Sequence, residues 1–191
     1  MEAEKIVNQY FESVSSEVLA RAKQIKLLIT DIDGVLTDGG IIYDNEGMEF
    51  KKFNVKDGLI VKHLRNNKIL VGAITGRNSP VVENRCEELK FDFHYHGVKQ
   101  KGAKLKEVLE TLEIEYEEVA YIGDDLIDLP ILTQVGLAVS ARDAMDYIKP
   151  AVHFVSNFDG GKGVFREVGD LILHAKGLLI PILQSYQNQG K

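Results

Sequence analysis

The stretch "IKLLITDIDGVL" at residues 25–36 determines the fold expected for this sequence. Its apolar part, "IKLLI" at 25–29, is typical of a buried strand, and Asp31 and Asp33 follow where that strand ends. Two carboxylates at such a position cost free energy unless a cation or hydrogen-bond donors compensate their charge. The stretch therefore predicts that other parts of the chain bring compensating groups to the end of this strand.

Strand and helix signals alternate along the rest of the chain. We expect strands at 26–30, 68–75, 91–96, 117–123, 136–140 and 153–156. We expect helices at 57–67, 79–90, 101–112, 125–135, 142–149 and from about residue 163. Connecting helices between strands rich in Val, Ile and Leu indicate the α/β class, with a Rossmann-like parallel sheet flanked by helices.

Three further segments complete a single expected domain over residues 1–191. Apolar residues at helical spacing predict one amphipathic N-terminal helix within 1–24. Two extended runs around "DNEG" predict a β-hairpin at 38–53, directly after the first strand. Residues 178–191 are interpreted as a C-terminal tail.

Composition excludes several classes of protein. The formal net charge is −6, whereas a nucleic-acid-binding surface usually needs a basic stripe. The single cysteine, Cys86, cannot form an internal disulfide. The first ten residues lack the order of a signal peptide, and the longest apolar run, at 177–183, is too short to span a bilayer. We expect a soluble, cytoplasmic protein with no nucleic-acid or membrane partner.

Polar groups follow four of the predicted strands, at the edge where ligands bind in open parallel sheets. They are Asp31, Asp33 and Gly34; Thr75, Gly76 and Arg77; Lys99 and Lys101; and Asp124, Asp125 and Asp128. Carboxylates this close repel one another unless a hard cation joins them, and Mg²⁺ prefers carboxylate oxygens, water and phosphate. A lysine and a threonine hydroxyl suit phosphoryl oxygens. The set predicts phosphoryl chemistry, with Asp31 ionised to attack phosphorus and Asp33 as proton donor.

The same residues carry a family resemblance. "DIDGVLTDG", "ITGR", a loop lysine and "GDDLID" resemble the four motifs of the haloacid dehalogenase-like phosphatases. "FNVKDG", "ITGRNSPVVENRCEELK", "YIGDDLIDLPIL" and "GGKGVFREVGDLIL" are similar to the 3-deoxy-D-manno-octulosonate 8-phosphate (KDO 8-phosphate) phosphatases, over residues 25 to 177. Four motifs in order are far more specific than any one of them.

The resemblance implies a role for each matched residue. Asp31 is the implied nucleophile, which forms an aspartyl-phosphate, and Asp33 the general acid and then base. Thr75 binds the phosphoryl group and Lys101 neutralises it, with Lys99 as the weaker candidate. Mg²⁺ is held by Asp31, the backbone carbonyl of Asp33, and Asp124. Supporting positions are Asp125 and Asp128.

The resemblance also implies a substrate and an assembly. The intervals around Thr75 are too short for a separate cap domain. The resemblance implies a capless homotetramer, in which the hairpin and a neighbouring subunit close each site. The implied substrate is KDO 8-phosphate, an intermediate in lipopolysaccharide synthesis. Candidates for binding its carboxylate are Arg77, Arg85, Lys162 and Arg166, because guanidinium groups hold carboxylates in pairs. Gly76 is a further candidate for binding the substrate. A nine-carbon relative, 2-keto-3-deoxy-nonulosonate 9-phosphate, fits the same charges.

Three less specific interpretations stay open. A response-regulator receiver domain also combines acids, a Thr and a Lys around Mg²⁺, but its phospho-accepting Asp ends the third strand, where this sequence has "HYHG". A non-catalytic domain of the same fold would not need the whole acidic set. Asp124, Asp125 and Asp128 also suit the start of a helix, where acids oppose the helix dipole.

Overall fold

A computed structural model describes residues 2–188, and its centre is a parallel sheet. The strands lie in the order β5-β4-β1-β6-β7-β8. Their bounds are β1 Leu27–Thr30, β4 Leu70–Ile74, β5 Phe93–Tyr95, β6 Val119–Gly123, β7 Leu137–Ser140 and β8 Phe154–Val155. Strand β1 lies between β4 and β6 and is parallel to both. The predicted α/β fold is therefore confirmed, with the first strand at the centre.

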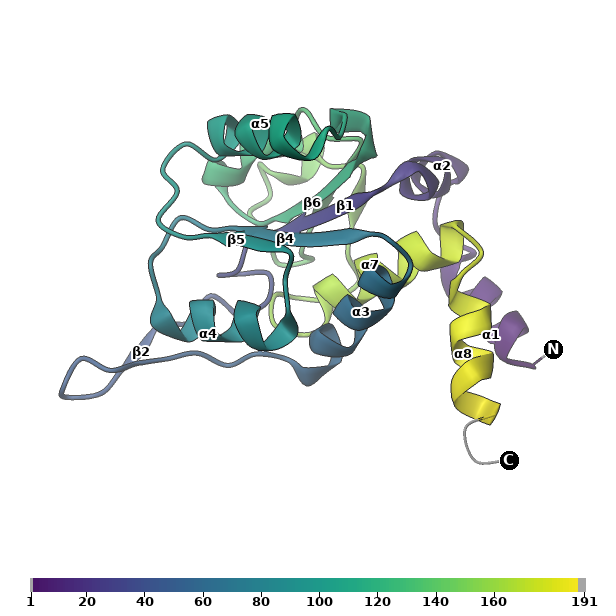
Figure 1. The fold of residues 1–191 in the computed structure, drawn as a ribbon, viewed down its shortest axis with the longest axis horizontal. Coiled ribbons are helices and arrows are strands. Elements are labelled where there is room, and N and C mark those ends of the chain that lie inside the picture. The colour runs from purple at the N-terminus through teal and green to yellow at the C-terminus, as the bar shows by residue number, and fades with distance from the viewer. Residues whose placement is uncertain (1, 189–191) are drawn as a thin grey trace.

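Helices cover both faces of this sheet (Figure 1). One face packs against α2 (Ser16–Gln24), α3 (Val55–Asn66), α4 (Pro80–Leu89) and α7 (Val164–Ala175), and the other against α5 (Lys101–Leu112) and α6 (Leu129–Leu132). Along β1, Leu28 belongs to the first core, whereas Leu27 and Ile29 belong to the second. This alternation is the two-residue period of a strand that is buried on both sides.

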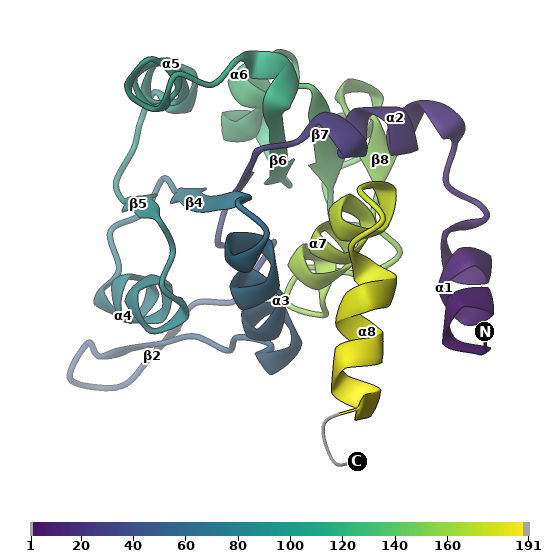
Figure 2. The same ribbon diagram turned by 45° about the vertical axis from the view of Figure 1, so that its right-hand side comes forward.

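The two ends of the chain differ from the prediction. A single N-terminal helix is wrong, because the segment forms α1 (Glu2–Phe11) and α2 with a break between them. Ser15 causes the break by capping α2, its Oγ accepting a hydrogen bond from the Val18 amide at 3.2 Å. The predicted tail contains α8 (Leu179–Asn188), which packs beside α1 (Figure 2). Met1 and residues 189–191 lie outside the described residues.

The helix predicted at 142–149 is also wrong. This segment forms turns that end in a 3₁₀ turn at Lys149–Ala151. Its amides bond to other loops instead of along a helix: the Arg142 amide donates to Phe158 O, and the Met145 amide to Asp124 O. The helix predicted at 125–135 is shorter, with a 3₁₀ turn at Leu126–Asp128 before α6.

The predicted hairpin forms, with very short antiparallel strands β2 (Ile42–Tyr43) and β3 (Glu49–Phe50). Its turn is held by Asp44, whose Oδ1 accepts hydrogen bonds from the Glu46 and Met48 amides at 3.0 and 2.7 Å. In Figure 1 the hairpin extends from the end of the molecule opposite α1 and α8. Across residues 2–188, no helix combines the length and the hydrophobicity needed to cross a bilayer.

Candidate active site

Asp31 is fixed at the end of β1 by the neighbouring strand. Its amide donates to Ile122 O of β6 at 2.9 Å, and the residue is 4 % exposed. Gly34, three residues later, has φ +84°, and a Cβ there would lie 2.0 Å from Asp124 Oδ2. Only glycine lets the loop after β1 approach Asp124 this closely. The "DIDG" sequence therefore places Asp31 beside the acids that follow β6.

Lys101, the first residue of α5, lies between two of these acids. Its Nζ is 3.0 Å from Asp31 Oδ2 and 2.7 Å from Asp128 Oδ1, and its side chain is buried. Burial by itself lowers the pKa of Lys101, but Asp31 and Asp128 outweigh this and raise the pKa above its ordinary value. The ammonium is therefore retained. Lys99, the other candidate, is exposed.

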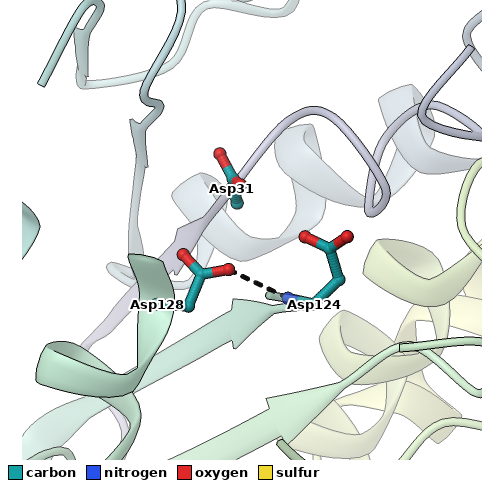
Figure 3. Close-up of side chains that lie close together, drawn as sticks. All are labelled: Asp31, Asp124 and Asp128. Atoms are coloured by element: carbon teal, nitrogen blue, oxygen red, sulfur yellow. Dashed lines mark hydrogen bonds between the residues drawn. The ribbon is translucent and has the colours of Figure 1, made fainter. Parts of the chain in front are cut away.

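Asp128 is fully buried and organises the loop after β6. Its Oδ2 accepts hydrogen bonds from the Asp124 amide at 2.9 Å and from the Asp125 amide at 3.2 Å; the first is drawn in Figure 3. Its Oδ1 accepts from the Tyr121 hydroxyl at 2.6 Å as well as from Lys101. A helix cap alone needs neither the lysine nor the tyrosine, so Asp128 does more than start a helix.

Asp31, Asp124 and Asp128 each offer one oxygen, and these oxygens lie within 4.8 Å of one another (Figure 3). Both oxygens of Asp128 already accept hydrogen bonds. In contrast, Asp31 Oδ1 is buried and has no hydrogen-bond partner among residues 2–188. A buried carboxylate oxygen without a partner fits a metal ligand. The donor set thus fits a hard cation held by Asp31 and Asp124, with Asp128 as support.

The pKa values of these acids agree with a cation site. Burial raises the pKa of Asp31 to about 6, Lys101 opposes that rise, and Asp128 adds to it. Burial, followed by repulsion from Asp31 and Asp128, raises the pKa of Asp124 to about 8. A divalent cation would remove this repulsion and stabilise both ionised carboxylates.

Asp31 and Asp124 line a cavity of about 220 Å³. It is lined by Asp31, Asp33, Gly34, Gly39, Thr75, Gly76, Arg77, Asp124, Asp125 and Ile127. Thr75 is held at the end of β4 by its amide, which donates to Tyr95 O at 2.9 Å. The cavity therefore combines groups from the ends of β1, β4 and β6, as the sequence predicted.

Three predicted substrate-binding residues do not line this cavity in the described chain. Arg85 pairs with Glu88 at 2.7 Å, Arg166 pairs with Asp170 at 2.6 Å, and Lys162 is exposed. Their roles stay predictions. Their positions depend on how α4, α7 and the loop before α7 pack, which the sequence does not indicate.

The sequence did not identify the hairpin side chains that contact two residues of the cavity lining, Asp33 and Arg77. Lys51 Nζ lies 2.5 Å from Asp33 Oδ1, and Glu49 Oε1 lies 3.1 Å from the Arg77 guanidinium. Arg77 also donates to the Tyr43 hydroxyl at 3.0 Å. A signal was present: in "MEFKKF" the charges at 49 and 51 alternate with Phe50, which places both on one face of a strand.

Comparisons with known proteins identify relatives of this chain. The sequence-family model described as haloacid dehalogenase-like hydrolase matches residues 95–168. The chain is 43% identical to the 3-deoxy-D-manno-octulosonate 8-phosphate phosphatase of Yersinia pestis, covering 91% of this chain and 92% of that protein. It is 45% identical to the Escherichia coli K12 enzyme of the same name, covering 87% and 88% respectively.

Solved structures extend the similarity to the fold. The Yersinia pestis phosphatase has a TM-score of 0.86 at 45% identity, covering 87% of this chain and 90% of that one. The Moraxella catarrhalis phosphatase, solved with a magnesium ion, a phosphate ion and a KDO molecule, has a TM-score of 0.87 at 36% identity, covering 89% and 98%. With this identity over most of both chains, the protein belongs to the 3-deoxy-D-manno-octulosonate 8-phosphate phosphatase family of the haloacid dehalogenase-like hydrolases.

Proposed function

We propose that this chain is a Mg²⁺-dependent phosphatase that hydrolyses 3-deoxy-D-manno-octulosonate 8-phosphate through an aspartyl-phosphate at Asp31. The contact of Lys101 with Asp31 carries the proposal: one oxygen of Asp31 is paired at 3.0 Å, and the other is buried with no hydrogen-bond partner in the described part of the chain, residues 2–188. The named activity of the relatives supports the substrate. We place the reaction in the cytoplasm, consistent with a single, buried thiol at Cys86.

In the proposed reaction, Asp31 attacks phosphorus and the bond from phosphorus to the sugar oxygen breaks. Asp33 gives a proton to that departing oxygen, so that the sugar leaves as a neutral alcohol. Asp33 then takes a proton from the water that attacks the aspartyl-phosphate, which releases inorganic phosphate and restores Asp31. Lys101 and Thr75 stabilise the phosphoryl oxygens. Mg²⁺ held by Asp31, the Asp33 backbone carbonyl and Asp124 supplies charge neutralisation at the phosphoryl group.

Substrate choice is tested by comparing kcat/KM for the eight-carbon and nine-carbon phosphosugars. We expect the eight-carbon compound to be preferred, because it is the named substrate of relatives with up to 45% identity. Preference for the nine-carbon compound would overturn the substrate assignment but leave the aspartyl-phosphate chemistry intact. If neither compound nor p-nitrophenyl phosphate is turned over in the presence of Mg²⁺, the proposed phosphatase activity is wrong.

Metal binding has a readout that does not depend on activity. Adding Mg²⁺ to the metal-free protein should raise its Tm, because a cation relieves repulsion between Asp31 and Asp124 and binds only the folded chain. Asp124→Asn should remove most of this Mg²⁺-induced increase. Asp146→Asn, which changes an exposed acid, is the matched control and should keep the increase. An equal increase in all three proteins would place the cation elsewhere.

We infer that the chain assembles as a homotetramer through its hairpin. Ile42, Tyr43, Met48 and Phe50 are 48–60 % exposed on a two-stranded ribbon, which is marginally stable alone. An exposed apolar group of this kind requires a covering surface, and a second copy of the same hairpin is the simplest one. Arg85, Lys162 and Arg166 stay candidates for binding the substrate carboxylate in such an assembly.

Phe50→Glu should dissociate the assembly and raise KM for the sugar phosphate, because a charge would be buried at the interface. Light scattering measures the mass, and steady-state kinetics the activity. Ile6→Glu changes a residue that is 60 % exposed on α1, at the other end of the molecule (Figure 1), and should leave the mass unchanged. A wild-type monomer with full activity would contradict the proposal.

A further inference from the structure

Lys51 follows β3 of the hairpin and contacts Asp33, and no motif points to it. Its side chain is completely buried. Its Nζ lies 2.5 Å from Asp33 Oδ1 and 3.6 Å from Glu49 Oε1. Neighbouring hairpin side chains are exposed, Phe50 by 48 % and Met48 by 57 %. A buried ammonium costs free energy and adds little net stability even when paired, so stability alone does not account for a lysine here.

The position of Lys51 defines which oxygen of Asp33 is free. Oδ1 accepts from Lys51 and, at 3.4 Å, from the Thr37 hydroxyl. Oδ2 has a more distant neighbour, Arg77 Nε at 3.6 Å. Two donors on Oδ1 fix the rotation of the carboxylate and leave Oδ2 for proton exchange. Proton transfer depends strongly on such alignment, because donor and acceptor must lie within hydrogen-bond reach.

The hairpin that carries Lys51 is itself attached to the end of β4. Glu49 accepts hydrogen bonds from the Arg77 guanidinium and from the Ser79 hydroxyl. Ser79 is the residue before α4, and its hydroxyl makes no capping bond to that helix. Glu49, two residues before Lys51, therefore fixes the hairpin to the segment after β4. This contact keeps the Lys51 ammonium beside Asp33.

We infer that Lys51 is a positioning residue for Asp33: it holds Oδ1 so that Oδ2 delivers a proton to the leaving oxygen of the sugar. This inference rests on the proposed phosphatase function. It makes the hairpin part of the proton-transfer machinery of its own subunit, separate from any role in assembly. Because Lys51 acts through Asp33, it matters only where the leaving group needs a proton.

The leaving group provides the test. kcat/KM reports steps up to the first irreversible one, here release of the alcohol from the phosphorylated enzyme. A sugar alkoxide needs protonation to leave, whereas p-nitrophenolate leaves without it. Lys51→Met should lower kcat/KM for the sugar phosphate about 30-fold, part of the contribution typical of general acids. For p-nitrophenyl phosphate the decrease should stay below about threefold, since that leaving group makes little use of the acid.

A double-mutant cycle shows whether Lys51 acts through Asp33. Once Asp33→Asn has removed the acid, adding Lys51→Met should cause almost no further loss with the sugar phosphate. Lys52→Met, the same change at the exposed neighbour, is the matched control and should behave like wild type. Light scattering and Tm of each variant check assembly and folding, and retained p-nitrophenyl phosphate turnover shows that the site is intact.

The outcomes distinguish the positioning role of Lys51 from the identity of the substrate. Equal losses with both substrates, or full additivity with Asp33→Asn, would overturn the positioning role and indicate a structural one. A wild-type protein that turns over p-nitrophenyl phosphate but not the sugar phosphate would overturn the proposed substrate instead. A Lys51→Met variant with wild-type kcat/KM for the sugar phosphate would overturn the inference directly.

Discussion

Asp31→Asn is expected to lower turnover of every phosphate ester by at least about 10³-fold, because it removes the attacking oxygen anion and an amide cannot form the aspartyl-phosphate. Asparagine has nearly the same shape as aspartate, so the hydrogen bond from the backbone amide of residue 31 to Ile122 O is retained. The variant should also fold well, since burial raises the pKa of Asp31 to about 6 and the carboxylate is therefore not in a favourable environment without a cation.

The measurement is steady-state turnover with both the sugar phosphate and p-nitrophenyl phosphate. Beryllium fluoride, which mimics a phosphoryl group on aspartate, should bind wild type and not Asp31→Asn. Asp146→Asn, an exposed acid paired with Lys149, is the control for the same chemical change and should retain wild-type turnover. Near-normal turnover by Asp31→Asn would show that another residue attacks phosphorus.

Lys101→Met should raise the barrier by about 3 kcal/mol, the loss typical of one fixed electrostatic stabiliser. Methionine fills most of the volume of the lysine, so the packing around the first turn of α5 changes little. The charge is lost from a point 3.0 Å from Asp31 and 2.7 Å from Asp128, leaving two buried acids without their common partner. Stability should decrease as well, because breaking a buried pair leaves uncompensated charge.

Lys99→Met is the matched control for Lys101→Met. Lys99 is exposed and lies two residues before Lys101, in the loop that precedes α5. Its replacement should change kcat by less than about threefold, as expected for a surface substitution. Both variants are compared by kcat, kcat/KM and Tm. A larger loss from Lys99→Met than from Lys101→Met would mean that the loop lysine of the family motif has been assigned to the wrong residue.

The sequence by itself determined the fold class and the centre of the site. Apolar strands alternating with helices required a parallel sheet, because only a surface covered on both faces buries such strands. Acids and a threonine directly after those strands, and a lysine at the end of a loop that follows another strand, were expected at one place, since the carboxyl ends of parallel strands share one edge of the sheet. Asp31, Thr75 and Asp124 could therefore be placed together without coordinates, and the choice of Lys101 over Lys99 came from the family resemblance.

Helix predictions from local sequence patterns were less reliable where backbone or capping hydrogen bonds compete with the helix. The segment 142–149 has a helical pattern, but its amides bond to the loops that contain Asp124 and Phe158. The N-terminal segment has one continuous apolar period, yet the cap at Ser15 divides it into two helices. In both cases hydrogen bonds between particular groups outweighed a weak average preference.

Only the tertiary structure decided which charged side chains reach the cavity from outside the strand ends. Arg85 and Arg166 had suitable chemistry, but each pairs with an acid one turn along its own helix, Glu88 and Asp170, and the packing of α4 and α7 leaves both arginines outside the cavity lining. Lys51 had no motif, but the hairpin brings it to Asp33. The end of a parallel strand has a position that the sheet topology fixes, whereas the direction of a long side chain on a helix or hairpin depends on contacts between segments far apart in sequence.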